Sequence, residues 1–322
     1  MKEDKEPLSL VLLPIALYTS FVFGINNSGL STGSLLASGF SYRKGIAVTG
    51  MGFVAGALLE GWKMGGTLTG LTGLQGAVLP VLFTTLIITS VVFSIFSFLG
   101  MPISLVNILV GSYVGAGLAM NVFVNYAYLN IIALSWITLP VLAALATIAC
   151  YRITVRLLAN MSPVGVGRFH LIAMPVIVFY TAYSLGANNI GLLHNLTLHD
   201  TQLIEILLLI FLPVASFFGV MKSGRTSRFV SEGIVGHSPT TVFSSLLVGA
   251  VLVWLFTQAA IPVSLSQLLI GGLVGVNLYR KPRVYNKDAL LKLVAAWVGA
   301  TVISFFTALA LHGILVSAGG GI

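Results

Sequence analysis

Two short motifs occur twice in this chain with nearly the same separation. The motif Gly24–Gly29 reads GINNSG and returns as GANNIG at Gly186–Gly191, an offset of 186 − 24 = 162 in the numbering. The motif Pro102–Ser104 reads PIS and returns as PVS at Pro262–Ser264, an offset of 262 − 102 = 160. Because two separate motifs keep one order and nearly one spacing, the sequence predicts a duplicated structural unit.

Long apolar runs surround these motifs. Hydrophobic residues make up 57% of the 322 residues and charged residues only 7%, whereas a soluble domain has about 25% charged residues. A bilayer-spanning helix needs about 20 apolar residues, so the length predicts an all-α polytopic membrane protein with about ten membrane elements. The net charge of +8 is scattered in short loops, which argues against a nucleic-acid partner and for a lipid bilayer.

The motifs divide the chain into four parts. We expect a first repeat at 1–125, a linking helix and cytoplasmic loop at 126–168, a second repeat at 169–288, and a C-terminal transmembrane helix at 289–322. Five crossings before the second repeat would invert it relative to the first. Two inverted-topology repeats, with discontinuous helices that meet at the membrane midplane, are a plan common to secondary transporters.

The basic residues support this layout. On one predicted side lie Arg43, Lys44, Arg152, Arg156, Arg168, Lys222, Arg225, Arg228, Arg280, Lys281, Arg283 and Lys287. The opposite loops hold almost no basic residue apart from Lys63. The positive-inside rule makes the basic side cytoplasmic, so we predict a multi-pass plasma-membrane protein with both termini outside.

The repeated motifs predict interruptions of helices at membrane depth, because unpaired backbone groups are tolerated there only inside protein or beside a wet cavity. We expect breaks at both Asn-Asn motifs and at Pro102 and Pro262, and a loop at Gly65–Gly76. Proline followed by serine is typical of a helix N-terminus. Free N–H groups and the positive end of the helix dipole favour an anion at such a terminus.

These features predict the residues that bind a substrate anion. The candidates are Ser104, Asn107, Ser264, Ser266 and Gln267, with Asn26, Asn27, Asn188 and Asn189 beside them. Alone, a Pro-Ser start is usually only a cap, and asparagine pairs often join helices. His194 is equally consistent with packing and with proton relay. Recurrence of both motifs in both halves favours the functional interpretation.

The sequence argues against an enzyme. It contains no His/Cys/Asp/Glu cluster with metal-ligand spacing, no pair of buried carboxylates and no Gly-x-Ser-x-Gly elbow. No motif indicates a cofactor or a confident metal site. Sodium held by amide and carbonyl oxygens near Asn26 and Asn188 is an alternative to anion binding.

At these motifs the chain resembles the inorganic phosphate transporter family, the phosphate/sulfate permeases, whose signature is a duplicated Gly-Ala-Asn-Asp-x-Ala-Asn-Ala with a recurring Pro-x-Ser-Ser/Thr-Thr-His. The matching residues are Gly24, Asn26, Gly33, Ser38 and Gly39 in the first copy, Gly186, Ala187 and Asn188 in the second, and Pro102 with Ser104 and Pro262 with Ser264. The resemblance implies an inverted-repeat secondary transporter that takes up phosphate with sodium or protons, or sulfate in one branch.

Departures from the signature refine this expectation. The aspartate of the motif is Asn27 in one copy and Asn189 in the other, and the Thr-His ending is Val106-Asn107 and Ser266-Gln267. The resemblance implies that those aspartates serve as cation ligands or charge partners. Their loss removes anionic oxygens that sodium favours, so proton coupling is expected rather than strong sodium dependence.

We therefore predict an ion-coupled permease for a small inorganic oxyanion, phosphate or sulfate, working by alternating access. Two alternatives stay open: a passive anion channel using the same dipoles, and a sodium or other cation transporter on the same scaffold. A homodimer is also open, because small-residue faces such as Gly50, Gly52 and Gly56 permit close helix contact without saying whose helix it is.

Overall fold

The computed structural model describes residues 9–72, 79–197, 202–233, 238–280 and 287–317, and within these it contains helices and no strand. The first half consists of α1 (Ser9–Ala37), α2 (Tyr42–Glu60), η1 (Gly61–Met64), α3 (Gly65–Thr72), α4 (Leu79–Phe98), α5 (Leu105–Ala119) and α6 (Tyr126–Leu158). The second half consists of α7 (Pro163–Leu185), η2 (Gly186–Ile190), α8 (Gly191–Asn195), α9 (Gln202–Val220), α10 (Gly224–Gly233), α11 (Pro239–Gln258), α12 (Leu265–Arg280) and α13 (Lys287–Ser317).

Seven helices among the described residues are long and apolar enough to cross a membrane. Large apolar side chains remain exposed on them, for example Ile137 on α6 at 70% and Leu203 on α9 at 65%. Such exposure suits a lipid environment, because a soluble protein rarely leaves extended apolar surfaces uncovered. The chain is thus an all-helical, multi-pass membrane protein, as the sequence predicts.

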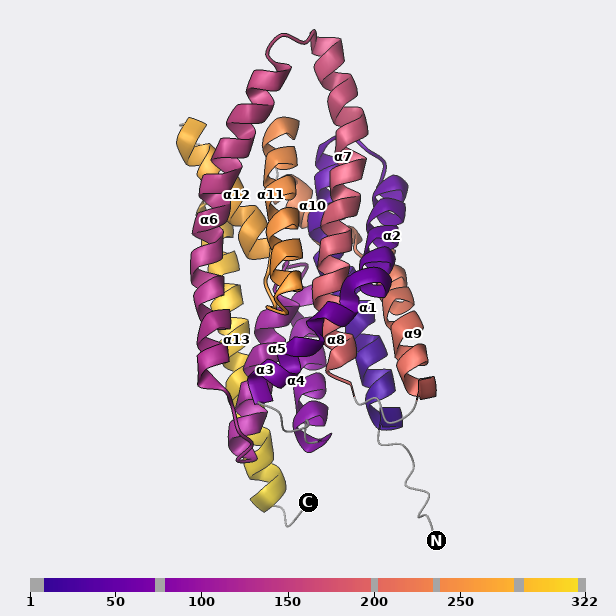
Figure 1. The fold of residues 1–322 in the computed structure, drawn as a ribbon, viewed down its shortest axis with the longest axis vertical. Helices are drawn as coiled ribbons and strands as arrows, with labels where there is room; N and C mark the ends of the chain where they lie inside the picture. Colours follow the sequence, from indigo (N-terminus) through magenta and orange to yellow (C-terminus); the bar gives the residue numbers. More distant parts are fainter. Residues whose placement is uncertain (1–8, 73–78, 198–201, 234–237, 281–286, 318–322) are drawn as a thin grey trace.

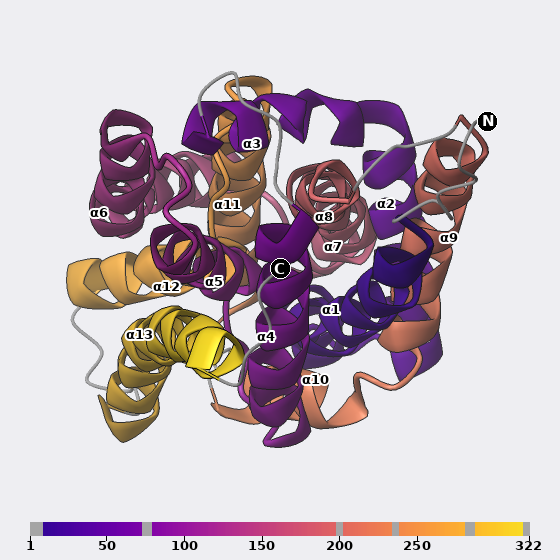
Figure 2. The same ribbon diagram turned by 90° about the horizontal axis from the view of Figure 1, so that it is seen from below.

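The helices form two flanks around a central group. Figure 2 shows α6, α12 and α13 on one side and α1, α2 and α9 on the other, with α4, α5, α7 and α11 between them. The most extensively packed helix pairs are α5 with α13, α6 with α12, α1 with α9 and with α10, and α2 with α7. All of these pairs join elements from opposite halves of the chain, so neither half forms its core alone.

Two helical hairpins turn inside the molecule. Helices α4 and α5 are separated by residues 99–104, here called the first tip, and α11 and α12 by residues 259–264, the second tip. Figure 1 shows the α4–α5 hairpin entering from the end where α6 begins and the α11–α12 hairpin entering from the end where α6 and α7 join. The inverted repeat itself stays a prediction. The interruptions expected at Pro102 and Pro262 are confirmed.

The breaks expected at the Asn-Asn motifs are wrong. Asn26 and Asn27 lie in the middle of the continuous helix α1, and Asn188 and Asn189 lie in the π-helical turn η2, which continues α7 into α8. The side chains of Asn26 and Asn188 hydrogen-bond to other elements, so they do not compete for the backbone groups of their own helices. A helix keeps its own backbone groups paired, which costs less in a membrane than a break does.

Glycine brings the Asn-Asn motifs close to neighbouring backbones. A Cβ on Gly24 would collide with the carbonyl oxygen of Ser216 on α9, and one on Gly186 would collide with that of Phe53 on α2. Any side chain at either position would therefore push two helices apart. The glycines serve close helix packing rather than the predicted helix breaks.

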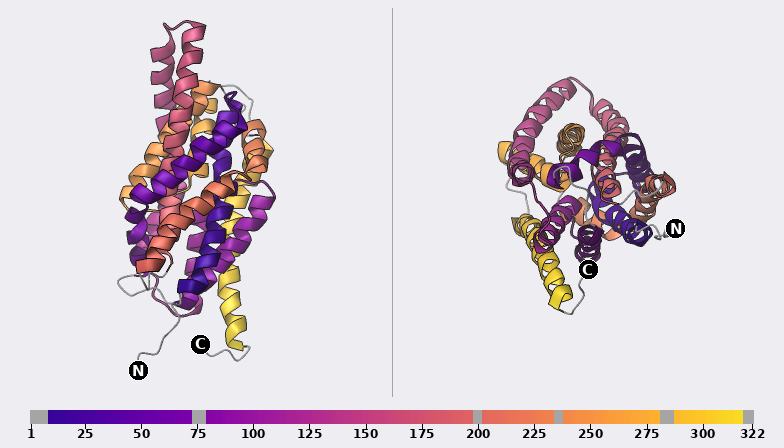
Figure 3. Two further views of the ribbon diagram at one scale, coloured as in Figure 1. Left: turned by 90° about the vertical axis from the view of Figure 1, so that its right-hand side faces the viewer. Right: turned by 60° about the horizontal axis from the view of Figure 1, so that its bottom comes forward.

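Two further expectations need correction. Residues 65–72 form helix α3 rather than a loop, while 73–76 lie outside the described residues. Helix α6 continues to Leu158, so only residues 159–162 connect it to α7. Figure 3 shows the joined ends of α6 and α7 projecting beyond the other helices. The expected cytoplasmic loop is therefore mostly helix, because its arginines occupy exposed helix surface.

Candidate functional site

The first tip is held by one buried amide. Asn26 on α1 is fully buried, and its Nδ2 donates to Ser97 Oγ at 3.0 Å and to the Met101 carbonyl oxygen at 2.8 Å. Its Oδ1 accepts from the Ile103 backbone N–H at 3.0 Å. A single asparagine thus pairs three groups around an interrupted helix, where an unpaired backbone group would be costly.

The second tip is held in the same way. Asn188 in η2 is also fully buried, and its Nδ2 donates to Thr257 Oγ1 at 3.0 Å and to the Ile261 carbonyl oxygen at 3.2 Å. Its Oδ1 accepts from the Val263 N–H at 3.2 Å. These three partners lie 160 positions after the partners of Asn26, which are Ser97, Met101 and Ile103.

The predicted helix N-termini are present directly after these tips. Helix α5 begins at Leu105 with Ser104 as its cap, and Ser104 Oγ accepts from the Asn107 N–H at 3.3 Å. Ser104 Oγ also donates to Asn107 Oδ1 at 2.8 Å. Helix α12 begins at Leu265, and Ser264 Oγ is hydrogen-bonded to Ser266 Oγ at 2.9 Å. Each terminus thus combines first-turn backbone N–H groups with a hydroxyl and further polar side chains.

The structure buries all nine predicted site residues. Gln267 is the most exposed of them at 8%, and Asn26 and Asn188 are at 0%. Lys, Arg, Asp and Glu are absent from the buried residues that the structure describes. Any attraction for an anion at this site therefore comes from backbone N–H groups, helix dipoles and neutral donors.

Ser31 adds a donor that the sequence analysis missed. Asn27 Nδ2 and Ser31 Oγ are buried atoms with no hydrogen-bond partner among the described residues. They are four residues apart on the continuous helix α1, so they share one face. The expected break at Asn27 hid this relationship, because i, i+4 spacing has structural meaning only within a helix. Unpaired buried donors of this kind suit a bound acceptor or water.

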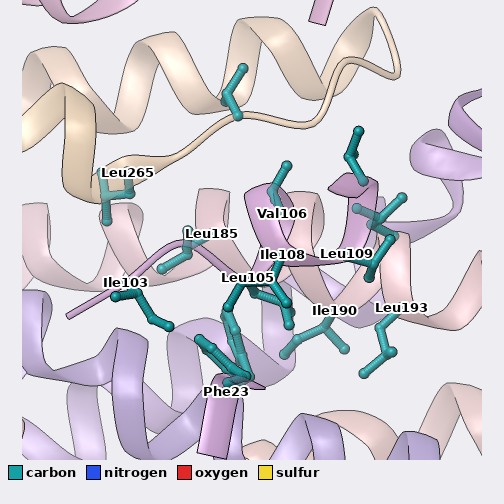
Figure 4. Packing of buried hydrophobic residues seen from close by; sticks show 14 of the residues in the cluster. Phe23, Ile103, Leu105, Val106, Ile108, Leu109, Leu185, Ile190, Leu193 and Leu265 are labelled. Carbon is teal, nitrogen blue, oxygen red and sulfur yellow. The ribbon is translucent and has the colours of Figure 1, made fainter. Parts of the chain in front are cut away.

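Apolar residues beside both tips belong to the same buried core. Figure 4 draws Ile103, Leu105 and Leu265 as members of one buried cluster, together with Leu185 and Ile190 from the ends of α7 and η2. All five are at most 1% exposed. The starts of α5 and α12 therefore belong to one core that also includes the second Asn-Asn motif. Direct anion contact by the nine residues remains a prediction.

His194, which follows the second motif, faces a small cavity. That cavity has a volume of about 160 Å³ and is lined by residues of α2, η1, η2, α8 and α9, including His194 and Glu205. Two residues able to exchange protons thus share one cavity beside the second motif. The described residues contain no group of three or more His, Cys, Asp or Glu side chains able to hold a metal ion.

Comparison with known proteins supports the resemblance read from the motifs. A sequence model of the "Phosphate transporter family" matches residues 168–308. A protein of Methanocaldococcus jannaschii, provisionally named a phosphate permease, is 26% identical over 91% of this chain and 93% of its own length. The sulfate permease CysP of Bacillus subtilis is 26% identical over 96% of this chain and 88% of its own length.

A solved structure shares the fold. "The sodium-dependent phosphate transporter" superimposes with a TM-score of 0.81, covering 96% of this chain and 98% of that chain at 18% sequence identity. At this identity the likeness establishes the fold and leaves substrate and coupling ion open. The family resemblance inferred from the sequence is confirmed by these matches.

Proposed function

We propose that this chain is a secondary transporter of phosphate or sulfate, because residues 168–308 match the phosphate transporter family and the chain shares the fold of a sodium-dependent phosphate transporter. The observation that carries the proposal is the pair of hairpin tips. Each tip is held by one buried asparagine through the same three contacts, and each is followed by a serine and the N-terminus of a helix. Two such helix N-termini, one from each half of the chain, supply the N–H groups and dipole ends that a tetrahedral oxyanion requires.

Substrate contact is assigned to the nine predicted residues and to Ser31. The donors among them are neutral, so the site neutralises anionic charge with dipoles rather than with lysine or arginine. A site with neutral donors releases an anion more readily than a site in which the anion pairs with a buried lysine or arginine. Such release is necessary for transport, because a carrier must both bind and let go.

The balance of donors and acceptors bears on which anion is carried. Sulfate only accepts hydrogen bonds at neutral pH, whereas singly protonated phosphate also donates one. Asn27 and Asn189 offer amides where the family signature has carboxylates, and Asn27 Nδ2 is an unpaired donor. Sulfate therefore fits the first motif well, while phosphate needs an acceptor such as Asn107 Oδ1. The relatives include permeases named for each anion.

Proton coupling is our proposal for the driving ion. His194 and Glu205 line one cavity beside the second Asn-Asn motif, and histidine changes its charge near physiological pH. The competing ion is sodium, because the structural neighbour is named a sodium-dependent transporter. Sodium would have to use amide and carbonyl oxygens near Asn26 and Asn188, whose Oδ1 atoms already accept backbone N–H groups.

Uptake by proteoliposomes tests the proposed function. Purified protein is reconstituted, and entry of labelled phosphate and labelled sulfate is measured under a proton gradient, a sodium gradient and neither. We expect saturable uptake of one anion, faster with an inward proton gradient. Uptake of neither anion under any gradient would contradict the proposal, and flux that follows the electrochemical gradient without saturation would indicate a channel.

A double substitution tests the site. Ser104→Ala with Ser264→Ala removes both hydroxyls at the helix starts, and we expect weaker anion binding because each terminus loses a donor. Ser41→Ala with Ser162→Ala, at the exposed N-caps of α2 and α7, is the matched control. Binding is measured by isothermal calorimetry in detergent. Equal affinity in the double mutant and the control would remove these serines from the site.

A further inference from the structure

The helix end before each hairpin tip is contacted by a cationic side chain from another helix. At the start of α10, Arg225 Nη1 donates to the carbonyl oxygen of Phe98, the last residue of α4. In η1, Lys63 Nζ donates to Oε1 of Gln258, the last residue of α11, at 2.6 Å. Neither contact involves the predicted binding residues.

The two contacts occupy corresponding positions of the duplicated sequence. The numbers of Arg225 and Lys63 differ by 225 − 63 = 162, and those of Gln258 and Phe98 by 258 − 98 = 160. These are the separations of the Asn-Asn and Pro-x-Ser motifs. The side chain of Arg225 also lies against the first tip, because a Cβ on Gly100 would be 2.8 Å from Arg225 Cγ. A cation at the end of the helix before the tip is therefore a repeated feature.

The chemistry of a helix end explains why a cation lies at each tip. The last carbonyl groups of a helix have no intrahelical partner, and the C-terminal end carries the negative pole of the helix dipole. Helices α4 and α11 both end inside the molecule, where these groups need donors. Arg225 supplies one to α4 directly. In α11 the side chain of Gln258 donates to the Trp254 carbonyl oxygen at 3.1 Å, and Lys63 donates to that side chain.

These contacts differ from the asparagine contacts in their access to water. Asn26 and Asn188 are fully buried, so their hydrogen bonds are costly to break and keep the shape of each tip. The side chain of Lys63 is 24% exposed, and Arg225 is exposed. Water can replace a broken hydrogen bond at an accessible position. The cationic contacts are therefore the ones that can open reversibly.

The two cations hold the tips from opposite ends of the molecule. In Figure 1, α10 lies toward the end where α6 and α7 join, whereas η1 and α3 lead toward the end where α6 begins. Thr67 on α3 also donates to the Ala260 carbonyl oxygen of the second tip, at 2.5 Å. Each tip is thus pressed against a short helix that covers one end of the central region.

We propose that Arg225 and Lys63 are positioning residues that close the two ends of the transport path. Arg225 holds the first tip against α10 and closes the end nearer the α6–α7 turn; Lys63 holds the second tip against η1 and closes the opposite end. Both contacts are made in this structure, which is therefore the occluded state. The inference rests on the proposed transport function, since alternate release of the two contacts gives alternating access.

The surroundings of Lys63 keep its contact charge-balanced. Glu60 Oε2 lies 3.2 Å from Lys63 Nζ and accepts from Trp254 Nε1 and Gln258 Nε2, each at 3.0 Å. Loss of the lysine alone would leave this carboxylate unbalanced. A test of Lys63 must therefore remove both charges, and Glu60→Gln with Lys63→Gln is the suitable variant.

Cysteine accessibility tests the proposal. The single cysteine is first replaced (Cys150→Ala), and a reporter is placed at a fully buried position beside each short helix, Ser223→Cys near α10 or Met64→Cys in η1. Reaction with a membrane-impermeant maleimide is measured in right-side-out and inside-out vesicles. We expect Arg225→Gln to raise labelling of Ser223→Cys about tenfold from the α6–α7 side only, as a shift between two states predicts.

The contact of Lys63 at the opposite end should give the matching result. The variant Glu60→Gln with Lys63→Gln should raise labelling of Met64→Cys from the other side only, while Arg225→Lys and Lys63→Arg should restore protection because they retain a cationic donor. Glu60→Gln alone controls for the lost carboxylate. The proposal is overturned if either variant increases the labelling of both reporters, or if neither variant increases labelling at all. It is also overturned if the conservative variants do not restore protection.

The outcome is separable from that of the proposed function. Anion uptake by the unsubstituted protein tests transport, and sided labelling tests the closing role of Arg225 and Lys63. If the protein transports phosphate or sulfate but the variants show no sided labelling, only the closing role of Arg225 and Lys63 is refuted. A protein with sided labelling that carries neither anion refutes the proposed substrate class and retains the two-ended closure.

Discussion

At the scale of single residues, Asn26 and Asn188 are the best-explained polar side chains of the molecule. Each donates to a hydroxyl and to a backbone carbonyl and accepts from a backbone N–H, and each contacts the backbone on both sides of a tip proline. An aliphatic side chain could pair none of these groups. The chemistry explains why asparagine stands at both positions, whether or not the same amides also reach a substrate.

Replacing either asparagine by alanine should lower the stability of the protein. Asn26→Ala leaves the Met101 carbonyl and the Ile103 N–H unpaired in the core, and each unpaired buried group costs about 1–3 kcal/mol. We expect a loss of at least about 2 kcal/mol in the free energy of unfolding, measured by equilibrium unfolding in mixed micelles. Asn160→Ala in the exposed α6–α7 turn is the control, and an equal loss there would contradict this role.

Asn27 is the residue that most directly concerns the coupling ion. Asn27→Asp restores the carboxylate of the family signature at a buried position. We expect anion uptake to become slower without sodium and to recover with it, because a sodium ion would balance the added charge. Initial uptake rates with sodium and with potassium provide the measurement, and Asn160→Asp is the control. Identical rates in both salts would argue against a cation site there.

At the scale of elements, the tips are interrupted helices with matching backbones. Gly100 has a φ of +75°, and Ala260, its counterpart in the second tip (260 − 100 = 160), has a φ of +55°. Glycine adopts a positive φ freely, whereas alanine is strained there. The Ala260 carbonyl oxygen accepts from Thr67 Oγ1 and, at 2.7 Å, from the Tyr128 hydroxyl. Tertiary hydrogen bonds therefore hold a conformation that the alanine itself disfavours.

Exchanging the two residue types should change stability in opposite directions. Ala260→Gly relieves the strain and should stabilise the protein by up to about 1 kcal/mol, whereas Gly100→Ala should destabilise it by about 1–2 kcal/mol. Thermal unfolding in detergent measures both. Two changes of the same sign would show that backbone strain does not control the tips.

At the scale of the whole molecule, the charge distribution predicts orientation. The described start of α1 and the described end of α13 lie at one end, and the α6–α7 turn lies at the other (Figure 1). Arg152 and Arg156 are near that turn, so the positive-inside rule places it in the cytoplasm. The first and last helices would then end on the outer side, as the sequence analysis proposes.

Sided labelling of two exposed positions checks this orientation. In the Cys150→Ala protein, Asn160→Cys in the α6–α7 turn should react with an impermeant maleimide only from the cytoplasmic side. Tyr126→Cys at the start of α6 should react only from outside, because α6 crosses the membrane between them. Labelling of both cysteines from the same side would contradict the predicted topology.

The local chemistry of the sequence determined the membrane class, the duplicated motifs and the tip interruptions. Apolar runs of this length are stable only in lipid, and proline both removes an N–H and fixes φ, so these features depend on near neighbours alone. The nine site residues were predictable as a buried group for the same reason, since polar side chains next to helix interruptions stay inside the protein.

Only the tertiary structure decided how the polar side chains are used. The sequence suggested breaks at the Asn-Asn motifs, yet α1 continues because Asn26 pairs with groups of the first tip, far along the chain. Ser31 joins Asn27 on one face only because that helix is continuous. The contact between Lys63 and Gln258 likewise joins opposite halves of the sequence. Such pairings depend on how distant helices pack, and no local pattern of residues encodes that packing.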